Sequence, residues 1–250
     1  MIFRAFFIQP SPGIEERKTS NEGERFNSMH SELPTLQDQL DSITANTRTL
    51  VPAERLAIGE QAVAELFSTG IEERILPVGA QAPEFALPDA VGRIQKSSDL
   101  LALGPLIVTF FRGRWCPYCM TEWETWRGLY GQIRSSGAFL VAVSPQTQRQ
   151  SDFTAQQHGL PFPLLRDEGS ALAARFGLVY AVPEYHQRYL RSILVNLPFL
   201  NGESSWALPI PGTFLLDSDG TVCFAEAHAD FRVRPEPSSV LNAMAKLIRR

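Results

Sequence analysis

This 250-residue chain has few cysteines, no long apolar run and no excess of positive charge. Three cysteines are too few for a small secreted fold held together by disulfides. Lys and Arg number 23 against 27 Asp and Glu, which gives a formal net charge of -4. A chain of this charge has no general positive field for a phosphate backbone, so we expect no nucleic-acid partner.

The apolar runs also exclude a membrane span, since the longest of them, such as residues 106–111, fall far short of roughly 20 residues. The apolar start at residues 5–8 follows Arg4 and stops at Gln9, and no small-residue cleavage pattern follows it. It is therefore unlike an export signal, and we expect a cytoplasmic protein. In that reducing compartment, a C-x-x-C pair is typical of reversible redox chemistry.

The chain divides into three segments by composition. Residues 1–35 are polar, rich in Pro, Gly, Ser and Glu, and show no sustained apolar period, so we expect them to be disordered. Residues 36–77 have helical periodicity and predict a pair of helices. Residues 78–250 alternate between strand and helix patterns and predict an α/β domain.

The predicted helical pair carries two apolar stripes at spacings of 3 and 4. They consist of Leu36, Leu40, Ile43, Thr47 and Leu50 in the first helix, and Leu56, Val63, Leu66 and Phe67 in the second. Pro52 suits the first turn of the second helix, and Gly70 suits its end. A pair of this size is too small to be stable alone, so we expect it to dock on the rest of the chain or on a second copy in a homodimer.

The α/β segment begins with two runs typical of buried parallel strands, residues 106–111 and 138–143. Between them, Trp123, Trp126, Tyr130 and Ile133 follow helical spacing, which predicts a strand–helix–strand unit. Further elements are expected as a helix over 148–157, a strand over 162–165, a helix over 170–176, a hairpin over 213–224 and a last helix after Pro237 with Ser238 or Ser239 as its cap.

Two of the cysteines, Cys116 and Cys119, lie at the turn between the first predicted strand and the helix. An ordinary thiol with a pKa of about 8.5 is only slightly ionised at pH 7. Cys116 immediately precedes the helix and its first residue, Pro117, so free amides and the helix dipole lower its pKa by about one unit. Arg112 and Arg114 are expected to lower it further.

Cys119 lies one helical turn after Cys116, on the same face, where its sulfur can resolve a mixed disulfide formed at Cys116. A zinc site is disfavoured because no second ligand pair exists among the four histidines. Two inert buried cysteines are a further alternative. Cys223 lies inside a predicted strand, where a small hydrophobic role is favoured over a redox one.

Five segments carry a resemblance to a known family. They are VGAQAPEFALPDAVGRIQKSSDL at 78–100, GPLIVTFFRGRWCPYC at 104–119, VAVSPQ at 141–146, LPFPLLRDE at 160–168 and PGTFLLDSDGTV at 211–222. Their order and spacing resemble the peroxiredoxin-like, or alkyl hydroperoxide reductase/thiol-specific antioxidant, branch of thioredoxin-fold proteins. The resemblance implies a three-layer thioredoxin-like (peroxiredoxin-type) fold with a central mixed sheet, here with an N-terminal helical extension over residues 36–77.

The resemblance also implies a cis proline that faces the active cysteine, and Pro211 matches it; an ordinary trans proline is the alternative. Peroxiredoxins proper are similar to one another in a Pro-x-x-x-Thr-x-x-Cys loop and a distal arginine. The corresponding positions here are Thr109, Gly113 and Pro211, so all three features are absent. Arg112 or Arg114 is left as a substitute for the arginine.

Other residues that could contribute to the site have more than one interpretation. Trp115 and Tyr118 either form an apolar rim around the sulfurs or pack against the helical pair. Glu122 is expected to be a solvated helix residue rather than a proton relay. The apolar insertion at 185–208 is a substrate groove, a subunit contact or, as the favoured reading, ordinary core.

The sequence therefore predicts a thiol-disulfide oxidoreductase with an antioxidant role. Cys116 attacks as the thiolate, Cys119 resolves and Pro211 shapes the substrate site, without metal or cofactor. The expected partners are a thiol reductant, from the thioredoxin or glutathione system, and a disulfide or peroxide substrate. A thiol-dependent peroxidase with the same cysteines is the first alternative, and a non-catalytic protein that dimerises through its helical pair is the second.

Overall fold

The computed structural model describes residues 34–248, and the chain from Thr35 onward forms one compact unit. The disorder expected over residues 1–35 lies outside the described residues, except at its last two positions. None of the helices in the described part has the length and apolar character that a membrane crossing requires. The helices and strands run in the order α2 (Leu36–Leu50), α3 (Ala53–Ser68), η1 (Ile71–Arg74), β1 (Ala86–Pro88), β2 (Ile94–Lys96), α4 (Ser97–Leu101), β3 (Leu106–Phe110), α5 (Pro117–Ser135), β4 (Phe139–Ser144), α6 (Gln148–His158), β5 (Leu164–Arg166), η2 (Glu168–Ser170), α7 (Ala171–Arg175), β6 (Val179–Ala181), α8 (Glu184–Ser192), α9 (Leu197–Asn201), β7 (Ala207–Pro209), β8 (Gly212–Leu216), β9 (Val222–Ala227) and α10 (Pro237–Ile248).

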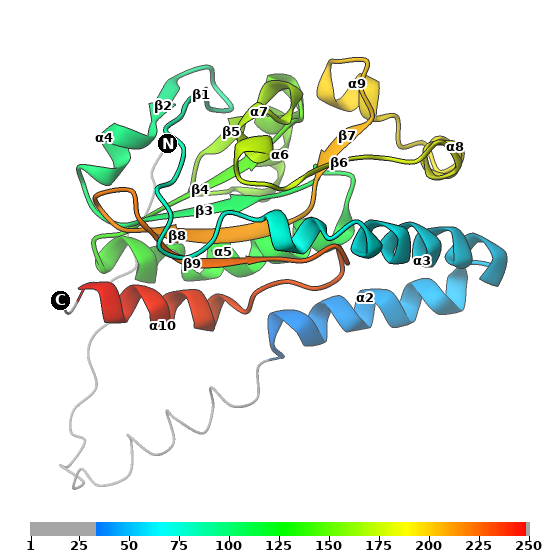
Figure 1. Ribbon diagram of the computed structural model, residues 1–250, viewed down its shortest axis with the longest axis horizontal. Coiled ribbons are helices and arrows are strands. Elements are labelled where there is room, and N and C mark those ends of the chain that lie inside the picture. The colour runs from blue at the N-terminus through cyan, green and yellow to red at the C-terminus, as the bar shows by residue number, and fades with distance from the viewer. Residues whose placement is uncertain (1–33, 249–250) are drawn as a thin grey trace, which may run out of the picture. The chain divides into compact units, whose positions relative to one another are not determined.

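The centre of the fold is a five-stranded mixed sheet in the order β5-β4-β3-β8-β9. β3 pairs in parallel with β4 and antiparallel with β8, while β8 and β9 form the antiparallel hairpin. Every residue of β3 is buried, as its β-branched and aromatic composition predicts for a central strand. Figure 1 shows α5 and α10 along one face of this sheet. The predicted α/β class and mixed sheet are confirmed.

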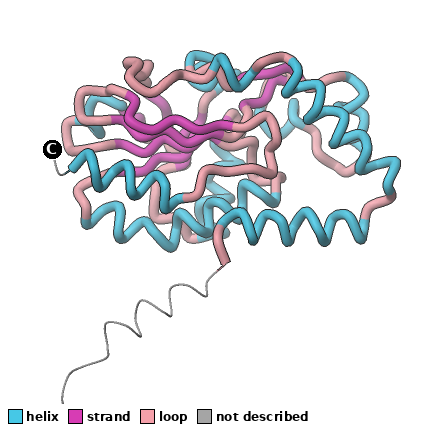
Figure 2. The backbone as a smooth tube through the Cα atoms, turned by 60° about the horizontal axis from the view of Figure 1, so that its bottom comes forward, coloured by secondary structure: helices cyan, strands magenta, loops and turns pink. Residues whose placement is uncertain are grey.

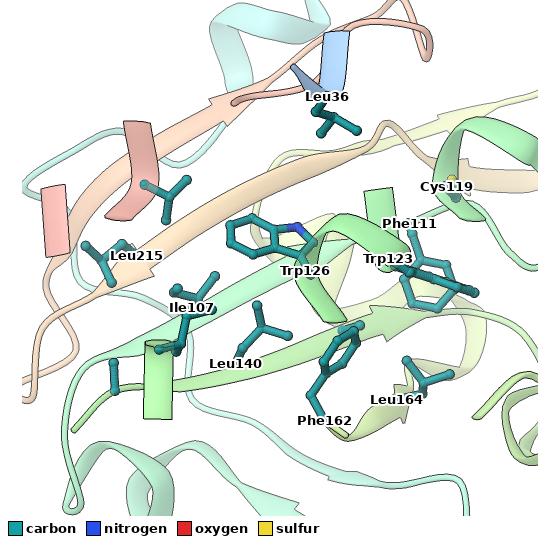
Figure 3. Close-up of a cluster of buried hydrophobic side chains, with 14 of the residues drawn as sticks. Leu36, Ile107, Phe111, Cys119, Trp123, Trp126, Leu140, Phe162, Leu164 and Leu215 are labelled. Carbon is teal, nitrogen blue, oxygen red and sulfur yellow. The ribbon is translucent and has the colours of Figure 1, made fainter. Parts of the chain in front are cut away.

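The face of the sheet under α5 holds the core that supports the cysteines. Trp123 and Trp126 of α5 are fully buried there, against Ile107 of β3 and Leu215 of β8. The ring of Phe111, just after β3, meets Trp123 edge-on with 4.2 Å between ring centroids. Figure 3 shows these side chains and Cys119 close to Phe111 and Trp123. Burial of the two tryptophans fixes α5, and with it both cysteines, on the end of β3.

The predicted helical pair is present as α2 and α3, which run antiparallel in Figure 2. Thr35 caps α2 through a reciprocal pair of hydrogen bonds with Asp38, a capping box. Leu36 and Leu40 pack into the core beside α5, so the pair docks on its own chain. The carboxylate of Glu236 accepts a 2.8 Å hydrogen bond from the Gln37 amide and so also holds the first turn of α2.

The prediction of a buried apolar stripe is wrong at the far end of each helix. Leu50 at the end of α2 is 82% exposed and Phe67 near the end of α3 is 64% exposed. Both helices touch the rest of the chain over only part of their length, so periodicity alone overstated the buried face. Gly70 takes the left-handed conformation after α3, as predicted for a helix end, and Pro237 begins α10 rather than preceding it.

Candidate active site

Cys116 is the N-cap residue of α5 and Pro117 is the first helical residue, as predicted. The loop that carries Cys116 begins directly after β3, with the Phe111 amide bonded to the Val143 carbonyl at 3.0 Å. The first amides of a helix have no partner within the helix, and the positive end of its dipole lies there. The amide of Cys119 donates one hydrogen bond to the sulfur of Cys116. The local sequence therefore places Cys116 where a negative charge is stabilised.

The two cysteines are buried together, Cys116 at 1% and Cys119 at 0% exposure, and no disulfide joins them. Burial by itself raises the pKa of Cys116. That effect is outweighed by a hydrogen bond from the Cys119 thiol and by the charges of Arg112 and Arg234, which together lower this pKa to about 5. Burial and the neighbouring Cys116 sulfur raise the pKa of Cys119. Cys116 is thus a thiolate at pH 7 and Cys119 a thiol.

Arg112 supplies part of this stabilisation from an unusual setting. Its guanidinium is 3% exposed, lies 4.7 Å from the Trp115 ring centre and 4.3 Å from that of Phe231, and forms no ion pair with a carboxylate in the described residues. Burial opposes its charge, but electrostatic interactions with Tyr180 and with the Cys116 thiolate raise its pKa. The Cys116 thiolate is therefore a counter-ion of a buried cation.

A second buried cation, Arg234, was missed in the sequence. It lies between the cysteines and Glu122: its Nη2 donates to the Cys119 sulfur at 3.5 Å and its Nε donates to a Glu122 oxygen at 2.7 Å. It also donates to the Phe231 and Val233 carbonyls. Arg234 is 115 positions from Cys119, in a loop with no recognisable motif, so no local signal identified it.

The expectation that Glu122 is solvated is wrong. Its side chain is buried at 1% exposure and accepts hydrogen bonds from Arg234, from Thr109 at 3.2 Å and from Trp126 at 3.4 Å. Glu122 lies one turn beyond Cys119 on the face of α5 that meets the sheet. Its pairing with Arg234 is what makes the burial of a carboxylate tolerable.

The other predicted site residues divide into those at the sulfurs and those away from them. Trp115 and Tyr118 both line the cavity over Cys116, and the Tyr118 hydroxyl also hydrogen-bonds to Thr44 of α2 at 3.1 Å. Tyr118 therefore does both of the things expected of it, and Trp115 is part of the rim. Arg114 instead stacks on Phe153 and reaches Gln150 of α6 at 3.4 Å, and it is not part of the cavity wall.

The expected cis bond before Pro211 is wrong, since residues 34–248 contain no cis peptide bond. Before Pro211, the Ile210 amide donates to the Leu178 carbonyl at 2.8 Å. Directly after Pro211, Gly212 already pairs with Phe110 of β3. The chain thus passes extended from β7 into β8, and the trans bond that X–Pro sequences favour fits without a tight turn. Pro211 is buried at the same end of the sheet as the cysteine loop but does not line the cavity.

Cys223 lies apart from the other two cysteines, on β9. It is half-buried, and its thiol donates to the Thr221 carbonyl at 3.7 Å. This environment fits the small hydrophobic role favoured for it. No cluster of three or more His, Cys, Asp or Glu side chains suited to a metal occurs in the described part of the chain, which leaves the C-x-x-C pair without further metal ligands there.

A cavity of about 210 Å³ opens over Cys116. The helical pair forms one wall, the cysteine loop and Phe231 form the floor, and a further wall comes from the insertion. The insertion residues in this wall are His186, Tyr189, Leu190, Ile193 and Val195. Core packing, the favoured interpretation of residues 185–208, therefore describes only part of this segment. Leu190 and Leu197 do form a small core, but α8 also lines the cavity over Cys116.

Known proteins match this chain in both sequence and fold. A family model described as the AhpC/TSA family matches residues 78–225. The thiol-disulfide oxidoreductase ResA of Bacillus thuringiensis is 24% identical over 148 residues, which are 59% of this chain and 68% of that protein. The crystal structure of peroxidoxin BcpB from Mycobacterium tuberculosis has a TM-score of 0.54 at 23% identity, over 69% of this chain and 98% of that one.

A mutant of peroxiredoxin 6 from Arenicola marina has the same TM-score of 0.54, at 18% identity, over 69% of this chain and 73% of that one. At these identities the solved structures establish the fold, and it is the predicted peroxiredoxin-type thioredoxin fold. The family model covers more than half of the chain, from the residues before β1 to β9, and includes both cysteines of the C-x-x-C pair. The chain belongs to the AhpC/TSA family.

Proposed function

We propose that this protein is a thiol-disulfide oxidoreductase in which Cys116 attacks and Cys119 resolves. The observation that carries the proposal is the pairing of an ionised and a protonated sulfur at one helix N-terminus, with the pKa of Cys116 lowered to about 5 and that of Cys119 raised. A thiolate is the reactive form of cysteine, and a thiol within hydrogen-bonding reach is placed to complete the exchange.

The reaction follows from this arrangement. The Cys116 thiolate attacks one sulfur of a disulfide, forms a mixed disulfide and expels the other half as a thiolate. Cys119 then gives up its proton and attacks the Cys116 sulfur, which closes a Cys116–Cys119 disulfide and expels the second half. The substrate gains two electrons and the protein loses two, so an external thiol must reduce the protein again.

The charges explain why Cys119 reacts only after Cys116. Before the attack, burial, the hydrogen bond to Cys116 and the charge of its thiolate all raise the pKa of Cys119, and Arg234 opposes them. Formation of the mixed disulfide removes the thiolate charge, while Arg234 stays 3.5 Å from the Cys119 sulfur. The pKa of Cys119 therefore falls once Cys116 has reacted, which activates the second nucleophile at the moment it is needed.

Alkylation and trapping test this proposal. The rate of reaction of Cys116 with iodoacetamide should rise with pH about a midpoint near 5, and the C119S variant should accumulate the mixed disulfide that the intact pair resolves. The C223S variant, altered on β9 away from the pair, is the matched control and should turn over normally. A midpoint near the ordinary 8.5, with no trapped adduct, would instead favour the non-catalytic interaction protein.

A thiol-dependent peroxidase is the second candidate, and Arg112 favours it. The buried guanidinium beside Cys116 forms no ion pair with a carboxylate in the described chain and can polarise a peroxide O–O bond, although the Pro-x-x-x-Thr-x-x-Cys pattern is absent. Hydrogen peroxide consumption with thioredoxin or glutathione as reductant, compared with insulin or small-disulfide reduction, ranks the two activities. Rapid peroxide turnover that is lost in C116S, with little disulfide reduction, reverses the order.

Three further predictions belong to this proposal. A thioredoxin or glutathione system supplies the electrons, the protein works in the cytoplasm, and a homodimer forms through the helical pair. The exposed Leu50 and Phe67 of α2 and α3 support the last of these, because they leave apolar surface outside the contact with α5. Light scattering on the full chain and on a L50E/F67E variant tests it, with loss of the dimer expected in the variant.

A further inference from the structure

The cavity over Cys116 combines a small volume with an apolar wall. Its volume of about 210 Å³ exceeds the roughly 150 Å³ of an engineered protein cavity that binds benzene, so one aromatic ring with a substituent fits. Its apolar lining includes Leu56 of α3, Leu190 and Val195 of the insertion, and Trp115 and Phe231. Cys116 at its floor is only 1% exposed. A disulfide held on the surface of a folded protein cannot approach that sulfur without displacing a wall.

Gly59 indicates that the space is kept open. It lies in the middle of α3 and in the cavity wall, where glycine costs about 1 kcal/mol of helix stability relative to alanine. Its backbone is not left-handed, and a Cβ at this position would meet no atom within 4 Å. Packing therefore gives no reason for the missing side chain. The consequence of the glycine is extra room for a ligand beside Leu56.

The cavity wall also contains a buried polar side chain with an unpartnered atom, His186. His186 in the wall is buried at 5% exposure, and its Nδ1 has no hydrogen-bond partner in the described chain. Burial and the charge of Arg112 lower the pKa of His186 to about 4, so the ring is neutral and offers one donor and one acceptor. A buried polar atom without a partner is costly unless a ligand or water completes its bonding.

The mouth of the cavity is cationic. Arg48 of α2 lies 4.0 Å from Glu60, at the limit of an ion pair, and the guanidinium of Arg55 of α3 has no hydrogen-bond or ion-pair partner in residues 34–248. Arg232 is already bound to Glu60 and Asp230. Two rim arginines thus remain to pair with an anion, above a floor where Arg112 is neutralised by the Cys116 thiolate.

We propose that this cavity selects small aromatic disulfides that carry a negative charge and excludes disulfides of folded proteins. The proposal rests on the proposed thiol-disulfide function and names its substrate class. One aromatic half lies between α3 and α8, its anionic group pairs with Arg48 and Arg55, and the sulfur attached to it meets Cys116. The displaced half leaves as a thiolate beside Arg112, and closure of the Cys116–Cys119 disulfide releases the bound half.

The experiment is a single-turnover comparison of the reduced full-length protein in a C223S background. The probes are dithiobis-nitrobenzoate, which is aromatic and anionic, dithiodipyridine, which is aromatic and neutral, hydroxyethyl disulfide and insulin. Protein oxidation is followed by acid quenching and intact mass. Each rate constant is divided by that of dithiothreitol with the same disulfide, which removes differences in intrinsic reactivity. We expect the aromatic probes to exceed hydroxyethyl disulfide by about tenfold, the value of a well-filled apolar pocket, and insulin to be slowest.

Substitutions at the cavity wall and at its mouth test the substrate assignment. G59L fills the cavity while favouring the helix, so the aromatic-to-alkyl ratio should fall about tenfold. G128L alters a matched, exposed helical glycine on α5 that also has open space around it, and should leave the ratio unchanged. R55Q should lower the anionic-to-neutral ratio by about threefold, as expected for an exposed ion pair. Circular dichroism verifies that each variant is folded, and G59A gives a smaller step in the same direction.

The possible failures are distinguishable. If hydroxyethyl disulfide or insulin reacts as well as the aromatic probes, or if G59L leaves the ratio unchanged, the substrate assignment is wrong and the thiol-disulfide function stands. If an arylalkyl hydroperoxide oxidises Cys116 faster than every disulfide, the cavity serves a peroxide and the assignment is again wrong. If none of the disulfides oxidises Cys116, the proposed function itself fails.

Discussion

The two faces of the central sheet bury comparable aromatic cores but differ in charge. On one face Phe110, Phe176 and Phe214 pack together with ring centroids 4.8–5.9 Å apart. On the face under α5, the two cysteines lie beside Arg112, Arg234 and Glu122, all 3% exposed or less. The other face also buries a carboxylate, Asp167, but its oxygens accept the Leu172 and Ala173 amides at 2.8 Å and so hold the turn before α7. Burying charge is expensive, so the gathering of two cations and a carboxylate beside the thiols indicates that these charges serve the chemistry rather than the stability.

The largest effect is expected from removing one partner of the buried Glu122–Arg234 ion pair on the charged face. R234M leaves the Glu122 carboxylate buried without its cation and should lower the free energy of unfolding by about 3–5 kcal/mol in urea denaturation. The double variant E122M/R234M places apolar side chains at both positions and should recover most of that loss. A single-variant cost below about 1 kcal/mol would mean that the pair is not desolvated as the structure describes.

The second prediction concerns pH and the charged face alone. The pKa of Cys116 is about 5 in the folded protein, below the ordinary unfolded value of about 8.5. A lowered acid pKa stabilises the fold fully above the unfolded value, and the contribution is lost as pH falls through the folded one. The unfolding free energy of wild type relative to C116S should therefore rise between pH 5 and 8.5, by at most about 1.4 kcal/mol per unit.

The raised pKa of Cys119 acts in a different window and does not obscure this slope. A group whose pKa is raised keeps its stabilisation below the unfolded value and loses it above, so Cys119 contributes a decline only above about pH 8.5. Denaturant titrations at several pH values, with C223S as the control, measure both limbs. A flat difference between pH 5 and 8.5 would contradict an ionised Cys116.

The third prediction concerns the apolar face and tests whether a change there leaves the thiol pKa unaffected. F214L removes part of a ring buried between Phe110 and Phe176 and should cost about 1–2 kcal/mol of stability through the cavity it leaves. The alkylation midpoint of Cys116 should stay where it is, because no charge near the sulfur changes. A shifted midpoint would show that the two faces are coupled through the sheet.

The sequence predicts the backbone of this site better than its electrostatics, for a physical reason. Burial of strand 106–110 and the helix start at Pro117 depend on periodicity and local capping, which are written in adjacent residues. The partner of Glu122 is 112 positions away, and only the finished fold brings Arg234 beside it. The predicted lowering of the Cys116 pKa by about one unit comes from the helix start alone, with Arg112 and Arg114 expected to add to it. The pKa falls further, to about 5, because Arg234 and the Cys119 hydrogen bond also contribute.

The insertion at 185–208 shows the same limit. Its apolar residues indicate burial, and several of them do form a small core, but the pattern does not tell a core from a cavity wall. Tyr185 hydrogen-bonds to Glu65 of α3 at 2.6 Å, a contact across 120 positions that sets α8 opposite the helical pair. The trans bond at Pro211 likewise follows from its place between two strand pairings, which the residue itself does not encode.

The smallest expected effect joins the charged face to the helical pair. Tyr118 of the C-x-x-C motif stacks edge-on with Phe231 at 5.4 Å and hydrogen-bonds to Thr44 of α2 at 3.1 Å. Y118F keeps the ring and removes only the hydroxyl, so it should cost about 1 kcal/mol. T44V should cost a similar amount, and a double-mutant cycle isolates their shared bond. If the two losses simply add, α2 is held by Leu36, Leu40 and the Glu236 contact without help from this bond; if they overlap, the hydroxyl pair ties the cavity wall to the motif that carries the thiolate.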